Sequence, residues 1–551
     1  MSSKNKLQIY APLTTDCEIR LVHLLPGDKA DDLVCEVQHA RLDDIPSYEC
    51  LSYRWGHDKA GAINLGGDAR LELNENLLNA LRFLRQQDTT RVLWADQICI
   101  NQVDNEEKTK QVELMGEIYQ SASRVIAWLG LADDKTPSTF EFLNSLYSSA
   151  RNNYIREMAH NKELGAPDAL FDNKKPKNDL VPIRDAADFM LELVRAKLGH
   201  DVDHESASYL LSLIALLRDM RPRNATDPRD KVFALLNVAV NNNVLGIKPD
   251  YTTDWPEAYT KTSRWLLTNQ KGLSFLKLVE VKAKMESRIP SWVPDFRSHD
   301  HMNFLYQPRM IIRKTNLYCS AGNSQAFFRD VNDPNLLAVR ALYVGTIKSV
   351  SEPPGNLLGN VALGQRVLDG GEWPQVAHGW AKNGLYDPTG ESILAAYARL
   401  RAGDCVGRLS SNVKERPLAE DYPSPGEFLF DANADWLLRG DRDDIGMTIL
   451  GQTTRRRMFF TDTGYLGLMH RSNRVGDKVF VLLGGDMPFV LRPKGDRFLF
   501  RGEAYVHGIM DGEALTKARQ RADPSWTPTT GWFEELRNGS LPFDTEEIIL
   551  E

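Results

Sequence analysis

Three short apolar segments that alternate with two helical patterns are the feature that most constrains the fold of this chain. The segments cover residues 48–53, 92–95 and 124–129. Asn74 can cap a leucine-rich helix between the first two segments, and an amphipathic stripe over 105–122 separates the last two. Strands that alternate with helices usually form a parallel sheet, so this pattern predicts an α/β domain.

The rest of the chain predicts a helical middle region and a β-rich C-terminal region. The first ~45 residues contain two strand-like segments, and helical patterns recur between residues 206 and 267. From Arg457 onward, short apolar segments recur between glycine-containing turns, which is typical of a small antiparallel sheet or barrel. The predicted domains are 1–300, with core motifs at 48–130 and 222–251, and a β-rich domain at 301–551.

Composition excludes several classes of protein. The chain has 67 Lys and Arg against 75 Asp and Glu, a net charge of -8, which argues against a nucleic-acid partner held by charge alone. No apolar run reaches the ~20 residues of a membrane span, and Met1–Lys6 does not open a signal peptide. The six cysteines form no CxxC pair, so we expect reduced thiols in a cytoplasmic protein rather than disulfides or a zinc site.

Polar and aromatic side chains that follow the three predicted strands are the candidate site residues. The carboxyl ends of parallel strands share one edge of the sheet, and ligands of open α/β sheets bind there. Aromatic rings suit stacking on a base, carboxylates suit ribose hydroxyls or a developing cation, and a helix N-terminus suits an anion. The candidates are Tyr53, Trp55, Gly56, Asp96, Asn101, Gln102, Glu107 and Lys108.

The same residues also have structural explanations. Trp55, like Trp94 and Trp128, fits a core aromatic, and Asp96 fits a cap on the turn after its strand. Glu107 stabilises a helix N-terminus by roughly 0.3–1 kcal/mol without any catalytic role. Cys99 lies in an apolar run and is predicted to be an inert packed thiol.

Motifs elsewhere in the chain have simpler interpretations, and we expect no metal site. His299 and His301 fit a solvated loop, and His200 and His204 fit a helix surface. Ser138–Glu141 fits a helix capping box. The basic run Arg455–Arg457 is predicted to be a sheet edge or an interaction patch.

Three blocks of this sequence resemble the fungal heterokaryon incompatibility (HET) domain. They are Tyr48–Gly56, then Leu93–Gln102 with its continuation through Glu107 and Lys108 to Gly130, and finally Asp227–Leu236 with Pro249–Tyr251. The segment Gly502–Glu513 is similar to the tail of many such proteins. Cys50 and Arg54 stand where alanine and an aliphatic residue are commoner, and both are compatible with the fold.

The resemblance implies a role in fungal non-self recognition, in which HET-domain proteins trigger programmed death of a mixed cell. The first hypothesis is therefore a cell-death signalling module that acts by self-association or by binding a protein partner and needs no cofactor. The β-rich region would regulate this module or detect the partner. A copy that has lost killing activity and serves another regulatory or biosynthetic role is a further possibility.

The second hypothesis makes the same domain an enzyme. HET domains are distantly similar to Toll/interleukin-1 receptor (TIR) domains, several of which cleave NAD, so the resemblance implies a possible NAD glycohydrolase. Its roles would fall to Glu107 or Asp96 for stabilising the oxocarbenium-like transition state, Tyr53 or Trp55 for stacking, and Asn101 and Gln102 for positioning the sugar. A TIR-type glutamate after the third strand is not evident unless Glu141 supplies it.

Overall fold

The structure is a computed structural model, and it forms two compact units. It describes residues 10–56, 59–66, 69–132, 213–239, 246–269, 272–279, 281, 288–298, 318–329, 331–351, 384–404, 406–408, 413–415, 452–453, 455–529, 532–538 and 541–551. Met1–Leu213 with Phe233–Thr252 makes up the first unit, and Ile214–Val232 with Thr253–Glu551 makes up the second. The domain boundary that the sequence predicted, between residues 300 and 301, stays a prediction.

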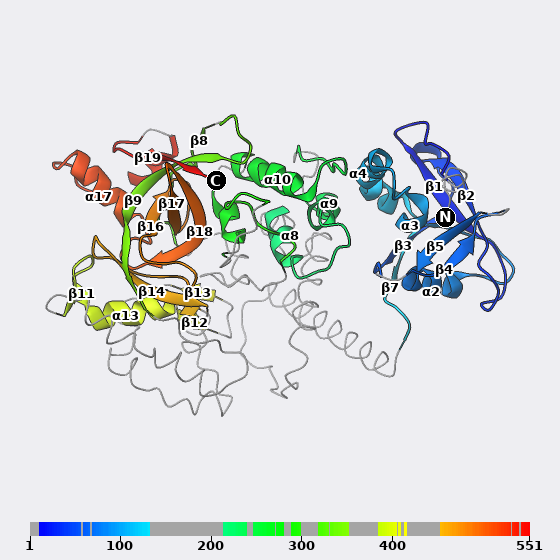
Figure 1. The fold of residues 1–551 in the computed structure, drawn as a ribbon, viewed down its shortest axis with the longest axis horizontal. Coiled ribbons are helices and arrows are strands. Elements are labelled where there is room, and N and C mark those ends of the chain that lie inside the picture. The colour runs from blue at the N-terminus through cyan, green and yellow to red at the C-terminus, as the bar shows by residue number, and fades with distance from the viewer. Residues whose placement is uncertain are drawn as a thin grey trace, which may run out of the picture. The chain divides into compact units, whose positions relative to one another are not determined.

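A five-stranded mixed sheet is the centre of the first unit (Figure 1). Its order is β2 (Cys35–Arg41), β1 (Glu18–Leu24), β6 (Arg91–Trp94), β3 (Glu49–Tyr53) and β7 (Arg124–Trp128). As predicted, the three central segments of the sequence are strands, and β3 runs parallel to both β6 and β7. The sheet is mixed rather than purely parallel, because β1 joins it antiparallel to β6 and pairs antiparallel with β2.

Local sequence signals explain the connections between these strands. The hairpin of β4 (Lys59–Asn64) and β5 (Arg70–Asn74) leads into α2 (Glu75–Leu84), and the Asn74 side chain accepts a hydrogen bond from the Leu77 N–H at 3.0 Å. The predicted cap is therefore confirmed. The leucine face of α2 is buried with Leu21, Leu51 and Trp94 in one hydrophobic core.

Two helices follow β6. The single turn α3 (Asp96–Cys99) begins directly after the strand, and α4 (Asn105–Ser121) leads to β7. The Asp104 carboxylate caps α4 by accepting hydrogen bonds from the N–H groups of Glu106 and Glu107. This cap fixes the first turn of α4, which carries two of the candidate site residues.

Helices follow in the middle region, as predicted. They are α8 (Leu213–Asp219), α9 (Asp230–Leu236), α10 (Trp255–Asn269) and the 3-10 helix η4 (Ser274–Leu278). A separate turn comes just before α9. There the Asp227 carboxylate pairs with the guanidinium of Arg229 and also accepts a hydrogen bond from the Arg229 N–H.

The predicted barrel is present in the second unit. Its strands are β8 (Phe328–Arg329), β9 (Leu337–Val350), β14 (Arg456–Thr461), β15 (Leu466–His470), β16 (Lys478–Leu482), β17 (Pro488–Lys494), β18 (Arg497–Val506) and β19 (Glu546–Leu550). Pairing runs in the order β14-β15-β18-β17-β16-β9, and an additional β14–β9 pairing closes the ring. Hydrogen bonds from the Leu273 N–H to the Gly484 carbonyl and from the Ser291 N–H to the Glu551 carbonyl attach the preceding segments to this barrel.

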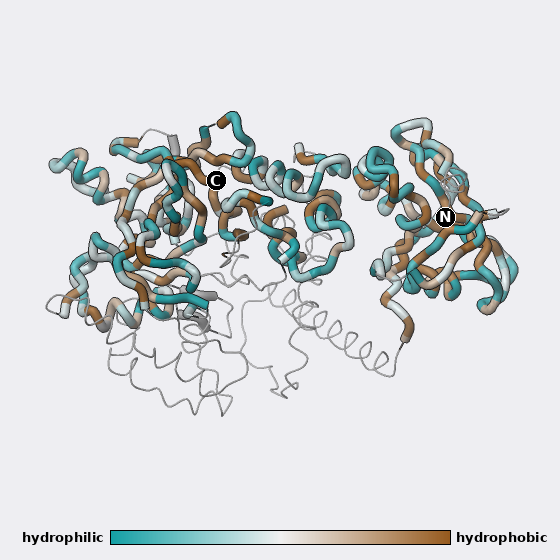
Figure 2. Tube along the Cα trace, viewed as in Figure 1, coloured by the Kyte–Doolittle hydropathy of each residue, from teal (hydrophilic) through white to brown (hydrophobic). Residues whose placement is uncertain are grey.

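Small elements complete the second unit. They are β10 (Leu385–Tyr386), β11 (Glu391–Ser392), α13 (Ile393–Ala402), β12 (Val406–Arg408), β13 (Val413–Glu415), α17 (Glu513–Ala522) and η7 (Trp532–Asn538). Figure 2 shows hydrophobic residues in the sheets of both units, whereas α17 is largely hydrophilic. Glu141, His200, His204, His299 and His301 lie outside the described residues.

Candidate functional site

The Asp96 carboxylate brings together the first two sequence blocks. The Tyr53 hydroxyl donates a hydrogen bond to Asp96 Oδ1 at 2.7 Å, and the Trp55 indole N–H donates to Asp96 Oδ2 at 2.9 Å. The Gln97 N–H also donates to Oδ1, at 2.8 Å. This arrangement follows from the parallel pairing of β3 and β6, because it places the ends of both strands at the same edge of the sheet.

The local environment keeps Tyr53 in its donor form. Burial and, next, the negative charge of Asp96 raise the pKa of the Tyr53 hydroxyl well above its ordinary value. Both oxygens of the Asp96 carboxylate therefore accept hydrogen bonds from aromatic side chains whose orientation they fix. Because the Gln97 N–H also binds Oδ1, the structural explanation of Asp96 as a turn cap agrees with the geometry as well.

The predicted sugar-positioning residues organise the loop after α3. The Gln102 side-chain amide donates to the Asp96 carbonyl at 2.9 Å, and the Asn101 N–H donates to Glu107 Oε1 at 2.8 Å. Gly56 is exposed, and a Cβ atom there would meet the Asn74 Cβ only at 3.8 Å, so space alone does not require a glycine. Contacts of these three residues with a ligand stay predictions.

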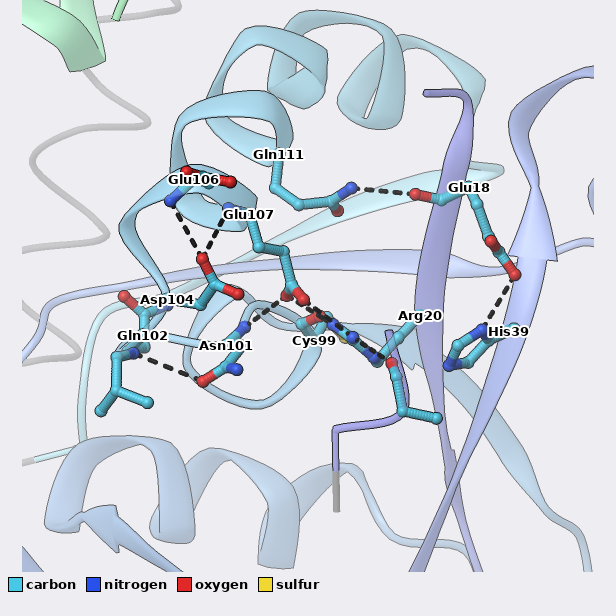
Figure 3. A network of polar contacts seen from close by, with 12 residues as sticks. Glu18, Arg20, His39, Cys99, Asn101, Gln102, Asp104, Glu106, Glu107 and Gln111 are labelled. Atoms are coloured by element: carbon cyan, nitrogen blue, oxygen red, sulfur yellow. Dashed lines mark hydrogen bonds and ion pairs between the residues drawn. The ribbon is translucent and has the colours of Figure 1, made fainter. Parts of the chain in front are cut away.

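Glu107 forms an ion pair with Arg20 of β1, a residue that the sequence analysis missed (Figure 3). Arg20 Nη1 lies 2.6 Å from Glu107 Oε1, and Nη2 lies 2.9 Å from Oε2. The guanidinium also donates to the Cys99 carbonyl at 3.2 Å and to the Ala11 carbonyl at 2.7 Å. The sequence could have indicated this pair, because Arg20 lies within the apolar run of β1 and a charge buried there needs a partner.

Because the pair is buried, breaking it costs a large free energy. The Arg20 side chain is 0% exposed and that of Glu107 is 11% exposed. Removing one partner of a buried pair typically costs about 3–5 kcal/mol, because the other charge is left without compensation. The geometry thus gives Glu107 a structural role at the first turn of α4, and the catalytic role of this residue stays a prediction.

Lys108 contacts the third sequence block. Its ammonium lies 4.0 Å from the centroid of the Tyr251 ring, and the Tyr251 N–H donates to Thr109 Oγ1 at 3.0 Å. One turn further along α4, the Asn237 side chain donates to the Val112 carbonyl at 2.8 Å. The three blocks that the sequence singled out therefore all meet around α3 and α4.

Cys99 is a buried free thiol, as predicted, and burial raises its pKa. In the parts of the chain that the structure describes, no group of three or more His, Cys, Asp or Glu residues is placed to hold a metal ion. The helices within those same parts include none that is both long enough and apolar enough to cross a bilayer.

Comparison with known families identifies the two folded regions. The model of the heterokaryon incompatibility protein (HET) family matches residues 48–185, and the model of the Het-6 beta-barrel domain matches residues 436–523. These matches confirm the resemblance of the sequence blocks to the HET domain, and they show a further likeness to the Het-6 barrel. The HET match contains every candidate site residue.

A curated relative aligns with most of this chain. The chain is 27% identical over 662 aligned residues to "Heterokaryon incompatibility protein 6, OR allele" of Neurospora crassa, and the alignment covers 92% of this chain and 95% of the relative. No solved structure matches this chain significantly. Neither the family matches nor this relative reports a likeness to TIR domains.

Proposed function

We propose that this protein acts in heterokaryon incompatibility, as part of fungal non-self recognition. The observation that carries the proposal is the alignment with the Neurospora incompatibility protein, which spans 92% of this chain and 95% of the relative. Both domain models match within that span. The HET domain would trigger death of the fused cell, and the Het-6 barrel would regulate it or detect the partner.

The geometry of the candidate site supports action by association rather than by chemistry. Asp96 binds Tyr53 and Trp55, and Glu107 binds Arg20, so both candidate catalytic carboxylates hold parts of the domain together. In this proposal the domain acts by binding a protein partner or a second copy of itself. The proposal also places the protein in the cytoplasm, which the free thiols of Cys17, Cys35, Cys50, Cys99 and Cys319 support.

The NAD glycohydrolase hypothesis has no support from the comparisons. Its premise is a likeness to TIR domains, which no comparison reports. Its chemistry would need a carboxylate that is free to face the substrate, whereas Glu107 makes a bidentate contact with a buried guanidinium. The TIR likeness and the predicted stacking role of Tyr53 or Trp55 therefore stay predictions.

A fusion assay tests the proposed function. The full-length gene is introduced into one of two compatible Neurospora strains, and heterokaryon growth is measured against a strain carrying the empty vector. We expect slow growth and uptake of a vital dye in the fused cells of at least one strain pairing. Normal growth in every pairing, with the protein detected at comparable levels, would count against the proposal.

A further inference from the structure

The segment Tyr10–Cys17 runs into β1 and lies against the Arg20–Glu107 pair. The Ala11 carbonyl accepts a hydrogen bond from Arg20 Nη2 at 2.7 Å, and the Tyr10 ring centroid lies 5.1 Å from Arg20 Cζ. Burial raises the pKa of the Tyr10 hydroxyl. Tyr10 and Ala11 therefore cover the buried guanidinium together.

Polar contacts attach this segment to the domain. The Thr14 N–H and hydroxyl both donate to Glu18 Oε2, at 2.5 and 2.8 Å. Figure 3 shows the other contact of this carboxylate, in which His39 Nδ1 lies 2.8 Å from Glu18 Oε1. Further along, Asp16 pairs with Lys110 of α4 at 3.2 Å. Glu18 therefore connects the segment to the sheet at a second place, besides the contact of Ala11 with Arg20.

The segment buries little of its own surface. Ala11, Pro12, Thr14, Thr15 and Asp16 are exposed. Segments with few apolar contacts and exposed hydrogen bonds open at low free energy, well before the whole domain unfolds. By contrast, Arg20 is fully buried beneath it.

We propose that residues 10–17 form a strap that closes over the Arg20–Glu107 pair, and that opening of the strap makes the Glu107 carboxylate accessible. Opening removes the Ala11 carbonyl from Arg20 and admits water, which weakens the ion pair by raising the local dielectric constant. The strap goes beyond the proposed incompatibility function and does not depend on it.

Hydrogen–deuterium exchange of the full-length protein, read by mass spectrometry with fragment-level resolution, tests the strap. Glu18→Gln removes the charged acceptor of both Thr14 donors and leaves Arg20 and Glu107 unchanged. We expect exchange in residues 10–17 to rise about tenfold or more. The Asn101 amide, which donates to Glu107, should exchange faster as well because water reaches the pair.

Two further variants complete the test. Thr14→Val removes only the hydroxyl donor and should produce a smaller rise at the same amides. Asp43→Asn is the matched control, since it removes a carboxylate from the exposed Arg41–Asp43 pair and should leave residues 10–17 and Asn101 unchanged. Faster exchange in residues 10–17 with no change at Asn101, or no change at either place in a folded Glu18→Gln protein, would overturn the proposal.

Discussion

Arg20 and Glu107 lie 87 positions apart in the sequence and form a bidentate ion pair that joins β1 to the first turn of α4. Glu107 also accepts the Asn101 N–H, so the pair fixes the loop between α3 and α4. This loop belongs to the central sequence block and lies within the residues that the HET family model matches. The ion pair therefore holds part of that matched region in place.

Loss of Glu107 should destabilise the domain strongly. Glu107→Ala leaves the buried Arg20 charge without its partner, so we expect the free energy of unfolding to fall by about 3–5 kcal/mol. Glu72→Ala in the exposed Lys59–Glu72 pair is the control and should cost less than about 1 kcal/mol. Urea unfolding measures both values. Equal, small losses for the two variants would contradict the structural role of Glu107.

NAD should survive incubation with this protein. The proposed function works by association, so we expect the purified wild type, Glu107→Gln and Asp96→Asn to leave NAD intact over hours, as measured by chromatography. Each variant must first be shown to be folded, because both residues bind partners inside the domain. Wild-type NAD consumption that disappears in the folded variants would instead establish the enzymatic hypothesis.

The indole of Trp55 should contribute more to stability than its partial exposure suggests. Trp55→Phe removes the donor to the charged Asp96 carboxylate, and hydrogen bonds to charged groups contribute about 1.5–3 kcal/mol. Trp128→Phe is the matched control, because Trp128 donates to the neutral Asn76 side chain at 2.9 Å, a bond of about 0.5–1.5 kcal/mol. Chemical denaturation compares the two, and a larger loss for Trp128→Phe would contradict the importance of Asp96.

Acid should weaken the protein through Glu18. The Thr14 N–H, and after it the other hydrogen bonds from Thr14 and His39, lower the pKa of Glu18 from 4.5 to about 2, against the opposing effect of burial. A carboxyl group with a depressed folded-state pKa stabilises the fold above its unfolded pKa and loses that effect as pH falls towards the folded value. The stabilisation is therefore present above pH 4.5 and lost on the way to about pH 2.

The corresponding measurement is the melting temperature of the wild type and Glu18→Gln between pH 6 and pH 2. The wild type should lose more stability than the variant across the acid part of this range, so the two curves should converge. Parallel curves would show that Glu18 is not held as the structure places it.

Sequence patterns predicted the features that depend on neighbouring residues. The alternation of strands and helices, the Asn74 cap and the glycine-punctuated barrel strands all follow from local periodicity and turn chemistry. The meeting of Tyr53, Trp55 and Asp96 was predictable too, because adjacent parallel strands end at one edge. The local strand pattern, together with the rule that adjacent parallel strands end at one edge of a sheet, was enough to predict this contact.

Contacts between segments that are distant in the sequence could not be predicted from local patterns. The position of β1 between β2 and β6, and hence the mixed sheet, depends on pairing that no local pattern encodes. The sequence predicted that the Glu107 carboxylate would face a ligand at the edge of the sheet, because nothing near it in the sequence reveals Arg20. Lys108 looked like a ligand contact for the same reason, since its partner Tyr251 comes from the third block.

Cell viability tests the central claim, that the HET domain assembled around Asp96 produces incompatibility, most directly. Two otherwise compatible Neurospora strains are fused, and one of them expresses the full-length wild type, Asp96→Asn, or the control Asp88→Asn at an exposed loop position. We predict that the wild type and Asp88→Asn kill most fused cells, whereas Asp96→Asn, at equal protein levels, restores growth. Killing by all three proteins alike, or by none, would contradict the account.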